Sequence, residues 1–283
     1  MPRYKLTIAY DGTDFCGWQK QEPPDPDNPG RRLILRTVQG VVEQAVRDTV
    51  REKIVLMGAS RTDSGVHARG QVAAFTSVPD DALGIGWPAD RGTDKLVTAI
   101  NGKLPRDVLI LGAELVDDAF NPIGDAIEKQ YTYTIDSGPV RPLWDRRYVF
   151  HTWHLLDLER MQQASAELVG EHDFAAFAQI NHGRTTTVRT IYQCEVHRVT
   201  PPETSETAST ESGPDAHTRF VIRVTGSGFL YNMVRIIAGT LMEVGRGKIS
   251  PDAIGEIINS ADRRRAGVTL PPQGLRLEWI RYP

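Results

Sequence analysis

The sequence predicts an α+β protein made of two similar halves, residues 1–117 and 118–283, each with an antiparallel sheet and helices. Three observations support this prediction. Apolar residues recur with the two-residue period of strands in some segments and with the three-to-four-residue period of helices in others. The order of these segments is similar in the two parts of the chain. The 283 residues also suffice for two domains, and we expect a ligand-binding cleft where the halves meet.

The sequence of the first half predicts secondary-structure elements in the order strand, helix, strand, strand, helix, strand. Apolar residues alternate through YKLTIAY, as on a half-buried strand, and valines recur at spacings of three and four in TVQGVVEQAVRDTV, as on a helix. The second helix opens with Thr93 or Asp94 as its N-cap and stops before Pro105. The predicted elements are strands at 4–10, 53–60, 71–77 and 107–116 and helices at 37–50 and 93–104.

The second half repeats this mixture of strands and helices. Asp157 is the expected N-cap of its first helix, and Gly170 lies just past the expected end. An acidic loop at 200–217, expected to be disordered, joins two long strands. The predicted elements are strands at 129–136, 186–199, 218–226 and 275–280 and helices at 157–170, 228–245 and 250–260.

The composition excludes several classes of protein. With 40% hydrophobic and 24% charged residues, the chain is typical of a soluble globular protein, and no apolar run reaches the roughly 20 residues of a membrane span. The start carries no signal-peptide core, so we expect a cytoplasmic protein. Cys16 and Cys194 are too few and too far apart for a disulfide framework or zinc site. His151 and His154 have metal-ligand spacing without a third ligand nearby, so no metal is predicted, and phosphate-binding and dinucleotide-binding motifs are absent from the sequence.

The charge distribution keeps nucleic acid open as a partner. The net charge is −3, but the segments 22–30 and 200–217 together hold seven acids and no lysine or arginine. Without them the net charge of the chain is +4. A mildly basic body of this kind is compatible with binding to a polyanion.

The stretch GASRTDSGVHARGQVAAF, residues 58–75, places Asp63 beside Arg61 in a predicted tight turn between two strands. Asp-Ser-Gly is ordinary turn chemistry, and one reading of these residues is no more than a turn. The functional reading is that the arginine lowers the pKa of Asp63 and keeps an ionised carboxylate available to act at the anomeric carbon of a sugar.

Two further groups have both a structural and a functional reading. The helix at 228–245 is apolar nearly all round, yet Arg235 lies in its middle beside small residues, so this arginine needs an acid or a phosphate as its partner. A structural ion pair and a pairing with Asp63 are both open. Tyr131 and Tyr133 share one face of a strand, where they serve either as core or as a surface for stacking on a base.

Taken together, these segments resemble the TruA family of tRNA pseudouridine synthases. The resemblance covers almost the whole chain and rests on several motifs in one order. Compared with the family pattern, the loop at 22–33 is longer and 200–217 is an insertion. The matching segments are YDGTDFCGWQKQ (10–21), RTVQG (36–40), GASRTDSGVHARGQVAAF (58–75), KQYTYTI (129–135), RTI (189–191), GFLYNMVRIIAGTL (228–241) and PPQGLRLEWI (271–280).

The resemblance implies an isomerase that converts uridine to pseudouridine at positions 38, 39 and 40 of the tRNA anticodon stem-loop. It implies pseudouridine synthase-like halves that resemble ferredoxin-like RNA-binding domains, no cofactor, and a homodimer that binds tRNA across both subunits. Asp63 would be the nucleophile, with Arg61 and Arg235 holding this carboxylate and the RNA, and Tyr131 would stack on the target uracil. The phosphate contacts would come from Arg61, Arg69, His67 and Lys20.

Two functions of other classes stay open at this point. The chain could be a structured-RNA-binding module in which Asp63 only braces Arg61, or a nucleoside or glycoside hydrolase. A hydrolytic glycosidase normally needs a second carboxylate, and no second acid is as well placed in the sequence.

Overall fold

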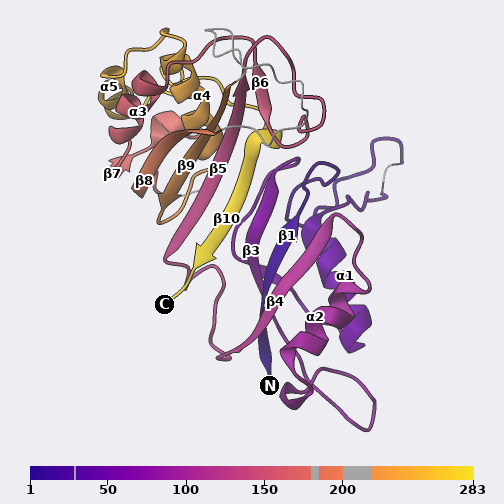
Figure 1. Cartoon of the computed structure of the whole chain (residues 1–283). Coiled ribbons are helices and arrows are strands. Elements are labelled where there is room, and N and C mark those ends of the chain that lie inside the picture. Colours follow the sequence, from indigo (N-terminus) through magenta and orange to yellow (C-terminus); the bar gives the residue numbers. More distant parts are fainter. Residues whose placement is uncertain (29, 180–184, 200–217) are drawn as a thin grey trace. The chain divides into compact units, whose positions relative to one another are not determined.

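The computed structural model describes residues 1–28, 30–179, 185–199 and 218–283 (Figure 1). The chain divides into two compact units. The first comprises Met1–Ile127 and Leu277–Pro283, and the second comprises Glu128–Arg276. The described residues thus form a mixed α/β fold whose strand pairs are mostly antiparallel.

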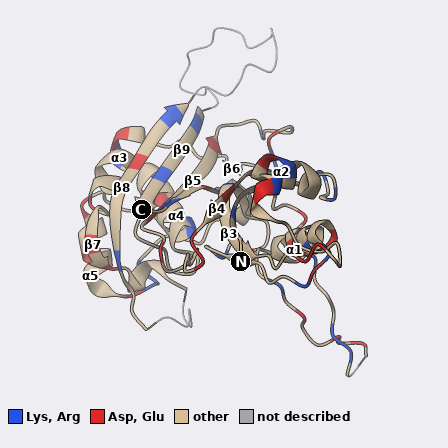
Figure 2. Cartoon of the chain, turned by 90° about the horizontal axis from the view of Figure 1, so that it is seen from below, with Lys and Arg blue, Asp and Glu red and all other residues tan. Residues whose placement is uncertain are grey.

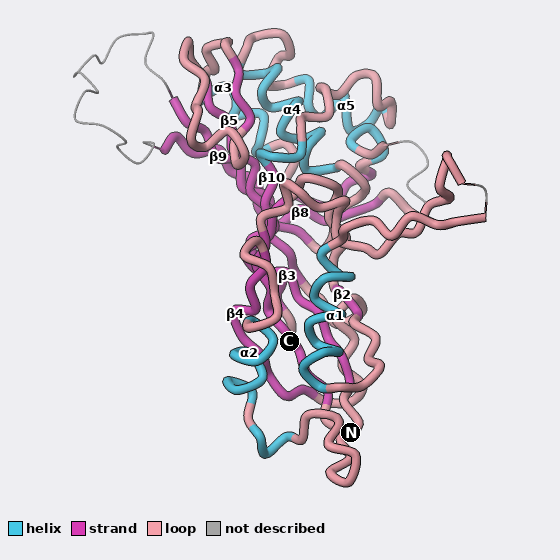
Figure 3. The backbone as a smooth tube through the Cα atoms, turned by 90° about the vertical axis from the view of Figure 1, so that its right-hand side faces the viewer, coloured by secondary structure: helices cyan, strands magenta, loops and turns pink. Residues whose placement is uncertain are grey.

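In the first unit, helices α1 and α2 lie on one face of a sheet with the strand order β4-β1-β3-β10, and β2 pairs with β3 (Figure 3). Strand β1 alternates between buried and half-buried residues, with Tyr4, Leu6 and Ile8 on the buried side, as its sequence predicts. The Thr37 side chain accepts a hydrogen bond from Gly40 N–H and so caps α1. The elements are β1 (Arg3–Tyr10), α1 (Val38–Val50), β2 (Met57–Gly58), β3 (His67–Thr76), the 3₁₀ helix η1 (Ala89–Arg91), α2 (Thr93–Asn101), β4 (Val108–Val116) and β10 (Leu275–Arg281).

In the second unit, strands run in the order β5-β9-β8-β7, with β6 parallel to β5, and three helices gather on one side of them (Figure 3). Asp157 caps α3 by accepting from Arg160 N–H, as predicted. The elements are β5 (Glu128–Ser137), β6 (Phe150–Thr152), α3 (Leu158–Ala166), β7 (Gly170–Asp173), η2 (Ala175–Phe177), β8 (Val188–Val199), β9 (Thr218–Gly226), α4 (Met233–Gly245), α5 (Ala253–Ser260) and η3 (Pro272–Gly274).

Several predicted boundaries are wrong. The strand expected over 53–60 is only Met57–Gly58, and the next strand begins at His67 rather than at residue 71. Helix α2 is preceded by Gly92 as its N-cap, without a side-chain cap. Helix α3 ends at Ala166, and Gly170, with a φ of 123°, opens β7 instead of ending the helix.

The first of these differences has a clear physical cause in helix α1. The Glu43 carboxylate accepts from Leu56 N–H at 3.0 Å, and the Gln39 amide donates to Leu56 O at 2.8 Å. Arg47 donates to Ile54 O at 3.0 and 2.8 Å. Side chains of α1 therefore bind Ile54 O and both polar backbone groups of Leu56, which a neighbouring strand would otherwise pair.

Of the two acid-rich segments, the structure describes the one near residues 22–30 but not the one at 200–217. Residues 22–28 and 30–33 form the two sides of an arm, which meet at an isolated bridge between Pro24 and Arg32. Asp25 N–H donates to Arg31 O, and Leu33 N–H donates to Pro23 O. Figure 2 shows this arm extending from the first unit and carrying both basic and acidic residues. The loop expected at 200–217 lies outside the described residues. Among the described parts of the chain, no helix is long and apolar enough to cross a membrane.

Candidate active site

The loop from Ala59 to Val66 carries Asp63 and lies between β2 and β3 in the first unit. Val66 N–H donates to Asp63 O at 3.2 Å, and Gly65 has a φ of 79°, so the predicted turn is present. Asp63 is half-buried and Arg61 is exposed. The loop thus presents an acid and a base directly before β3, a strand that is mostly buried.

The segment 10–18 clasps this loop from one side. Trp18 N–H donates to Thr62 O at 3.0 Å, and the Ser64 hydroxyl donates to Phe15 O at 3.0 Å. The hydroxyls of Tyr10 and Thr62 are hydrogen bonded at 2.7 Å in a buried position. Both neighbours of Asp63 are therefore fixed by hydrogen bonds to the same segment.

Close backbone approach explains two glycines in that segment. A Cβ at Gly12 would lie 1.9 Å from Val66 O, and one at Gly17 would lie 2.8 Å from Thr62 O. Gly17 also has a φ of 86°, a conformation that other residues rarely adopt. The loop can lie this close to the segment 10–18 only because both positions lack a side chain.

Gln71, on β3, holds the other side of the loop. Its side chain is fully buried; its amide donates to Ser60 O at 2.6 Å, and its oxygen accepts from Ser60 N–H at 3.2 Å and from Val72 N–H at 3.1 Å. This amide replaces a strand partner for Ser60 at the entrance to the loop. The sequence reasoning missed this residue, because a lone glutamine within an apolar strand carries no motif.

His67 lies at the exit of the loop and is buried, with 4% of its surface exposed. Gly12 N–H donates to its Nδ1 at 3.1 Å, and the carboxylate of Asp11 lies 3.2 Å from the same nitrogen. Arg69, two residues further along β3, is exposed. The structure thus places His67 where it supports the loop and Arg69 where it can meet a solvent-borne anion.

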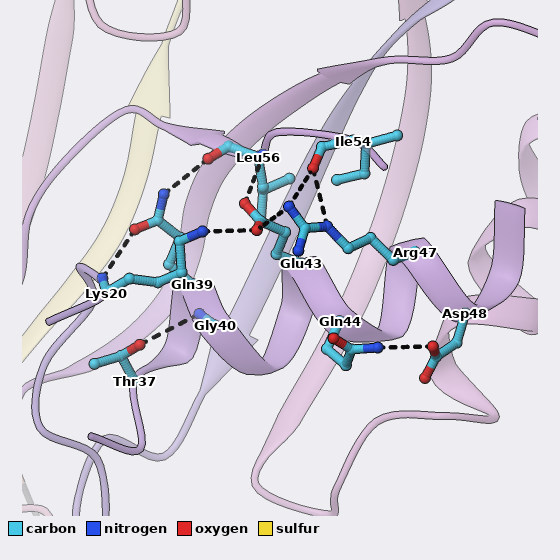
Figure 4. Close-up of polar contacts among 10 residues, drawn as sticks. All are labelled: Lys20, Thr37, Gln39, Gly40, Glu43, Gln44, Arg47, Asp48, Ile54 and Leu56. Atoms are coloured by element: carbon cyan, nitrogen blue, oxygen red, sulfur yellow. Dashed lines mark hydrogen bonds and ion pairs between the residues drawn. The ribbon is translucent and has the colours of Figure 1, made fainter. Parts of the chain in front are cut away.

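Lys20 is engaged with an acid on α1 (Figure 4). The Glu43 carboxylate is 2% exposed and lies 2.7 Å from both Lys20 Nζ and an Arg47 guanidinium nitrogen. Two cations and Leu56 N–H therefore surround a buried carboxylate, which would be costly to bury alone. The Lys20 ammonium is partly exposed and remains within reach of a further anion, but it shares its charge with Glu43.

Arg235 lies on α4 in the second unit and is half-buried, not buried as the apolar helix predicts. It donates to Leu270 O at 2.7 Å and to the Asn232 side-chain oxygen at 2.7 Å. The small residue beside it does admit another backbone, since a Cβ at Gly239 would lie 1.9 Å from Val268 O. Arg235 therefore also ties the 268–270 segment to α4, a role that the sequence reasoning did not foresee.

Tyr131 and Tyr133 are neighbours on β5, and both are buried, at 6% and 0% exposed. The Tyr131 ring meets Phe229 edge-on, with the ring centroids 5.3 Å apart. The Tyr133 hydroxyl donates to Pro271 O at 2.7 Å, and burial raises the pKa of this phenol, which Arg235 partly offsets. Tyr133 is thus a core residue, and Tyr131 presents only a small part of its ring.

The described residues contain no group of three or more histidine, cysteine or acidic side chains that could hold a metal ion. The His151 ring donates from Nε2 to Gly138 O at 2.9 Å and meets the Trp153 ring edge-on. Of the predicted site residues, Arg61, Asp63, His67, Arg69 and Lys20 lie in the first unit, and Tyr131 and Arg235 lie in the second. Tyr10, Glu43 and Gln71 support the loop or its flank and were not predicted.

Comparison of the sequence with known proteins finds relatives that share one description. A sequence profile described as tRNA pseudouridine synthase matches residues 164–283. Among curated relatives, tRNA pseudouridine synthase A 2 of Clostridium perfringens is 39% identical over 282 residues. The tRNA pseudouridine synthase A proteins of Acetivibrio thermocellus and Geotalea uraniireducens are each 40% identical over 282 residues. Each of these alignments covers 100% of this chain and 100% of the relative.

Proposed function

Since the chain belongs to the family of tRNA pseudouridine synthase A, we propose that it is an isomerase that converts uridine to pseudouridine in tRNA. The observation that carries this proposal is the full-length similarity to these relatives, at up to 40% identity. The loop around Asp63 supports it, because neighbouring groups fix this loop by hydrogen bonds on both sides.

The reaction breaks the bond between N1 of uracil and C1′ of ribose and forms one between C5 and C1′. The hydrogen on C5 is lost as a proton and N1 gains one, so the product is an isomer of the substrate. A single carboxylate suffices because the detached uracil is a delocalised anion, which needs less acid assistance than an alkoxide does. We assign this carboxylate to Asp63, as the nucleophile or as the group that stabilises positive charge at C1′.

The surroundings of Asp63 suit this role. Arg61 is two residues away and exposed, so it can meet an RNA phosphate beside the reacting nucleotide. Arg69 is exposed on β3 and would add a second phosphate contact, and Lys20 a third that it shares with Glu43. His67, being buried, would act on the RNA through the loop that it supports.

The second unit would contribute Tyr131 and Arg235. We propose that Tyr131 offers part of its ring to the target uracil, which must leave the base stack before it reacts. Arg235 would lower the pKa of Asp63 by pairing with it.

The finer features come from the family resemblance and extend the proposal. They are modification of positions 38, 39 and 40 of the anticodon stem-loop, two similar halves that form a cleft, a homodimer as the working form, and a cytoplasmic location. No metal or organic cofactor enters the proposed chemistry.

The decisive experiment is incubation with unmodified tRNA anticodon stem-loops, followed by mass spectrometry of the nucleosides. We expect pseudouridine from the wild-type protein and none from Asp63→Asn, which keeps the shape of the side chain and loses its charge. Asp81→Asn, at an exposed acid of the same unit, is the matched control and should retain activity.

The other possible functions give different products. Unchanged RNA bound with high affinity would indicate a binding module, and free uracil with an abasic site would indicate a hydrolase. Turnover by Asp63→Asn, with deamidation to the acid excluded, would contradict the assignment of the nucleophile.

A further inference from the structure

The segment 138–155, which we name the aromatic–arginine loop, exposes an unusual set of side chains. It connects β5 to α3 in the second unit and includes β6 (Figure 1). Trp144 is 78% exposed, Trp153 64% and Tyr148 47%. Exposed aromatic side chains gathered in one segment mark an interaction surface rather than a core.

The loop is held firmly at its base. Strand β6 pairs with the end of β5, and the Ser137 hydroxyl donates to His154 O at 2.7 Å. Arg219 binds the fully buried Asp136 through two hydrogen bonds, of 2.6 and 2.9 Å, and also donates to Asp145 at 2.6 Å. The loop therefore presents its side chains from an ordered base, which reduces the entropy lost when a partner binds.

One of the tryptophans is oriented by its neighbour. The His151 ring meets the Trp153 ring edge-on at a centroid distance of 4.4 Å, and His151 Nε2 lies 2.9 Å from Gly138 O. Trp153 thus has one ring neighbour and keeps most of its surface exposed.

The charge of the loop is positive toward the solvent. Arg141, Arg146 and Arg147 are all exposed, and the single acid of the loop, Asp145, is bound by Arg219. A second copy of this loop would be a poor partner. Across a twofold axis the three arginines of one loop would face the three of the other, and neither loop has a second acid to neutralise them. A single-stranded nucleic acid suits this surface better, because its phosphates can bind the arginines and its bases can stack on the aromatic side chains.

We infer that the aromatic–arginine loop binds unpaired nucleotides of tRNA, stacking bases on Trp144 and Trp153 and binding phosphates through its arginines. The inference rests on the proposed function for the choice of tRNA as the RNA. It adds an RNA-binding surface to the residues around Asp63, and its effect should fall on affinity rather than on the chemical step.

The test compares tRNA affinity in Trp144→Ala and Trp153→Ala with that in Tyr192→Ala, a half-exposed aromatic of β8 outside the loop. We expect each tryptophan variant to weaken binding by about 5- to 150-fold, as base-stacking aromatics do, and the control to bind like wild type. Trp144→Phe and Trp153→Phe should retain most of the affinity for tRNA. In the alanine and phenylalanine variants alike, turnover at saturating tRNA should equal that of the wild type. Arg141→Gln should make the slope of log K for tRNA binding against log salt concentration less steep by about 0.7–0.9, as expected when one phosphate contact is lost.

Tryptophan fluorescence separates RNA binding from protein association. tRNA should quench the emission of Trp144 and Trp153, so the amplitude of quenching should fall when both are replaced by phenylalanine and only Trp18, Trp87 and Trp279 remain. A quenching amplitude that is unchanged in that double variant would overturn the inference. So would unchanged tRNA affinity in both alanine variants, or a loss of self-association in them with no tRNA quenching in the wild type.

The failure of this inference and that of the proposed function look different. If the wild type makes no pseudouridine but the tryptophan-dependent tRNA binding persists, only the proposed function fails. If Trp144→Ala and Trp153→Ala bind and modify tRNA like wild type, only the RNA-binding surface fails.

Discussion

Replacing Gln71 with leucine should show how far the reaction depends on the geometry of the Asp63 loop. The substitution removes three hydrogen bonds, to Ser60 O, Ser60 N–H and Val72 N–H. A buried polar group left without a partner costs about 1–3 kcal/mol, but Ser60 is half-buried and water can reach part of it. We therefore expect a loss of about 2–4 kcal/mol in the free energy of unfolding, seen as a decrease in Tm of roughly 5–15 °C.

Activity should fall further than this destabilisation explains. With the strand-like anchor of Ser60 gone, Asp63 can shift, and a displacement of about 1 Å can cost on the order of 100-fold in rate. The assay is release of tritium from [5-³H]uridine in tRNA, measured well below the Tm.

The matched control for this experiment is Asn101→Leu. Asn101 donates to Ile110 O at 2.9 Å and accepts from Ile110 N–H at 2.8 Å, so the same kind of backbone bridge is lost at a site outside the loop. It should lower the Tm with little change in kcat. Equal losses of kcat in both variants, or a Gln71→Leu protein with wild-type kcat, would refute the positioning role of Gln71.

Two substitutions and one labelling experiment test other features of the structure. If Arg235 pairs with Asp63 as proposed, Arg235→Ala should lower activity and move the acidic limb of the pH profile to higher pH, and Arg235→Lys should retain more activity. An unmoved limb with a lower Tm would leave only the structural bonds to Leu270 and Asn232. Tyr131→Phe should retain more turnover than Tyr131→Leu if the ring stacks on uracil, whereas equal loss in both would assign importance to the hydroxyl or the packing. Burial raises the pKa of Cys194 to about 12, so at pH 8 a thiol reagent should modify Cys16 in the native protein and Cys194 only after unfolding; rapid native labelling of both would contradict this.

Local patterns in the sequence were sufficient to predict most elements and some of their ends. Asp157 caps its helix as predicted, because its side chain accepts from the backbone N–H three residues on, which is a purely local arrangement. Thr37 caps α1 in the same way, although it was not predicted as a cap. Helix α4 is almost wholly buried, as its uniform apolar composition indicates.

The differences arise where distant residues decide the structure. The segment at 54–56 is rich in β-branched and apolar residues, yet Gln39, Glu43 and Arg47 of α1 bind its backbone in place of a strand partner. Gly170 resembles the end of a helix in sequence, but its φ of 123° serves the entry into β7.

The candidate site shows the same division. Asp63, Arg61 and Arg69 lie within one short stretch of sequence, so a motif is enough to propose them as site residues, and their roles stay predictions. The support from Gln71 and Tyr10 could not, because it depends on how segments pack across the loop. His67 belongs to the same motif, but only the structure shows that it is buried.

The last strand has a consequence for how the protein is made. Leu277–Pro283 belong to the first unit, where Ile127 N–H donates to Arg281 O at 3.0 Å and the Tyr282 hydroxyl donates to Pro122 O at 2.8 Å. A ribosome that has synthesised all of Met1–Ile127 has therefore not yet supplied every piece of the unit that holds Asp63. That unit is complete only after its last residues have left the exit tunnel, so a nascent or prematurely terminated chain would lack the final strand of the unit that holds Asp63.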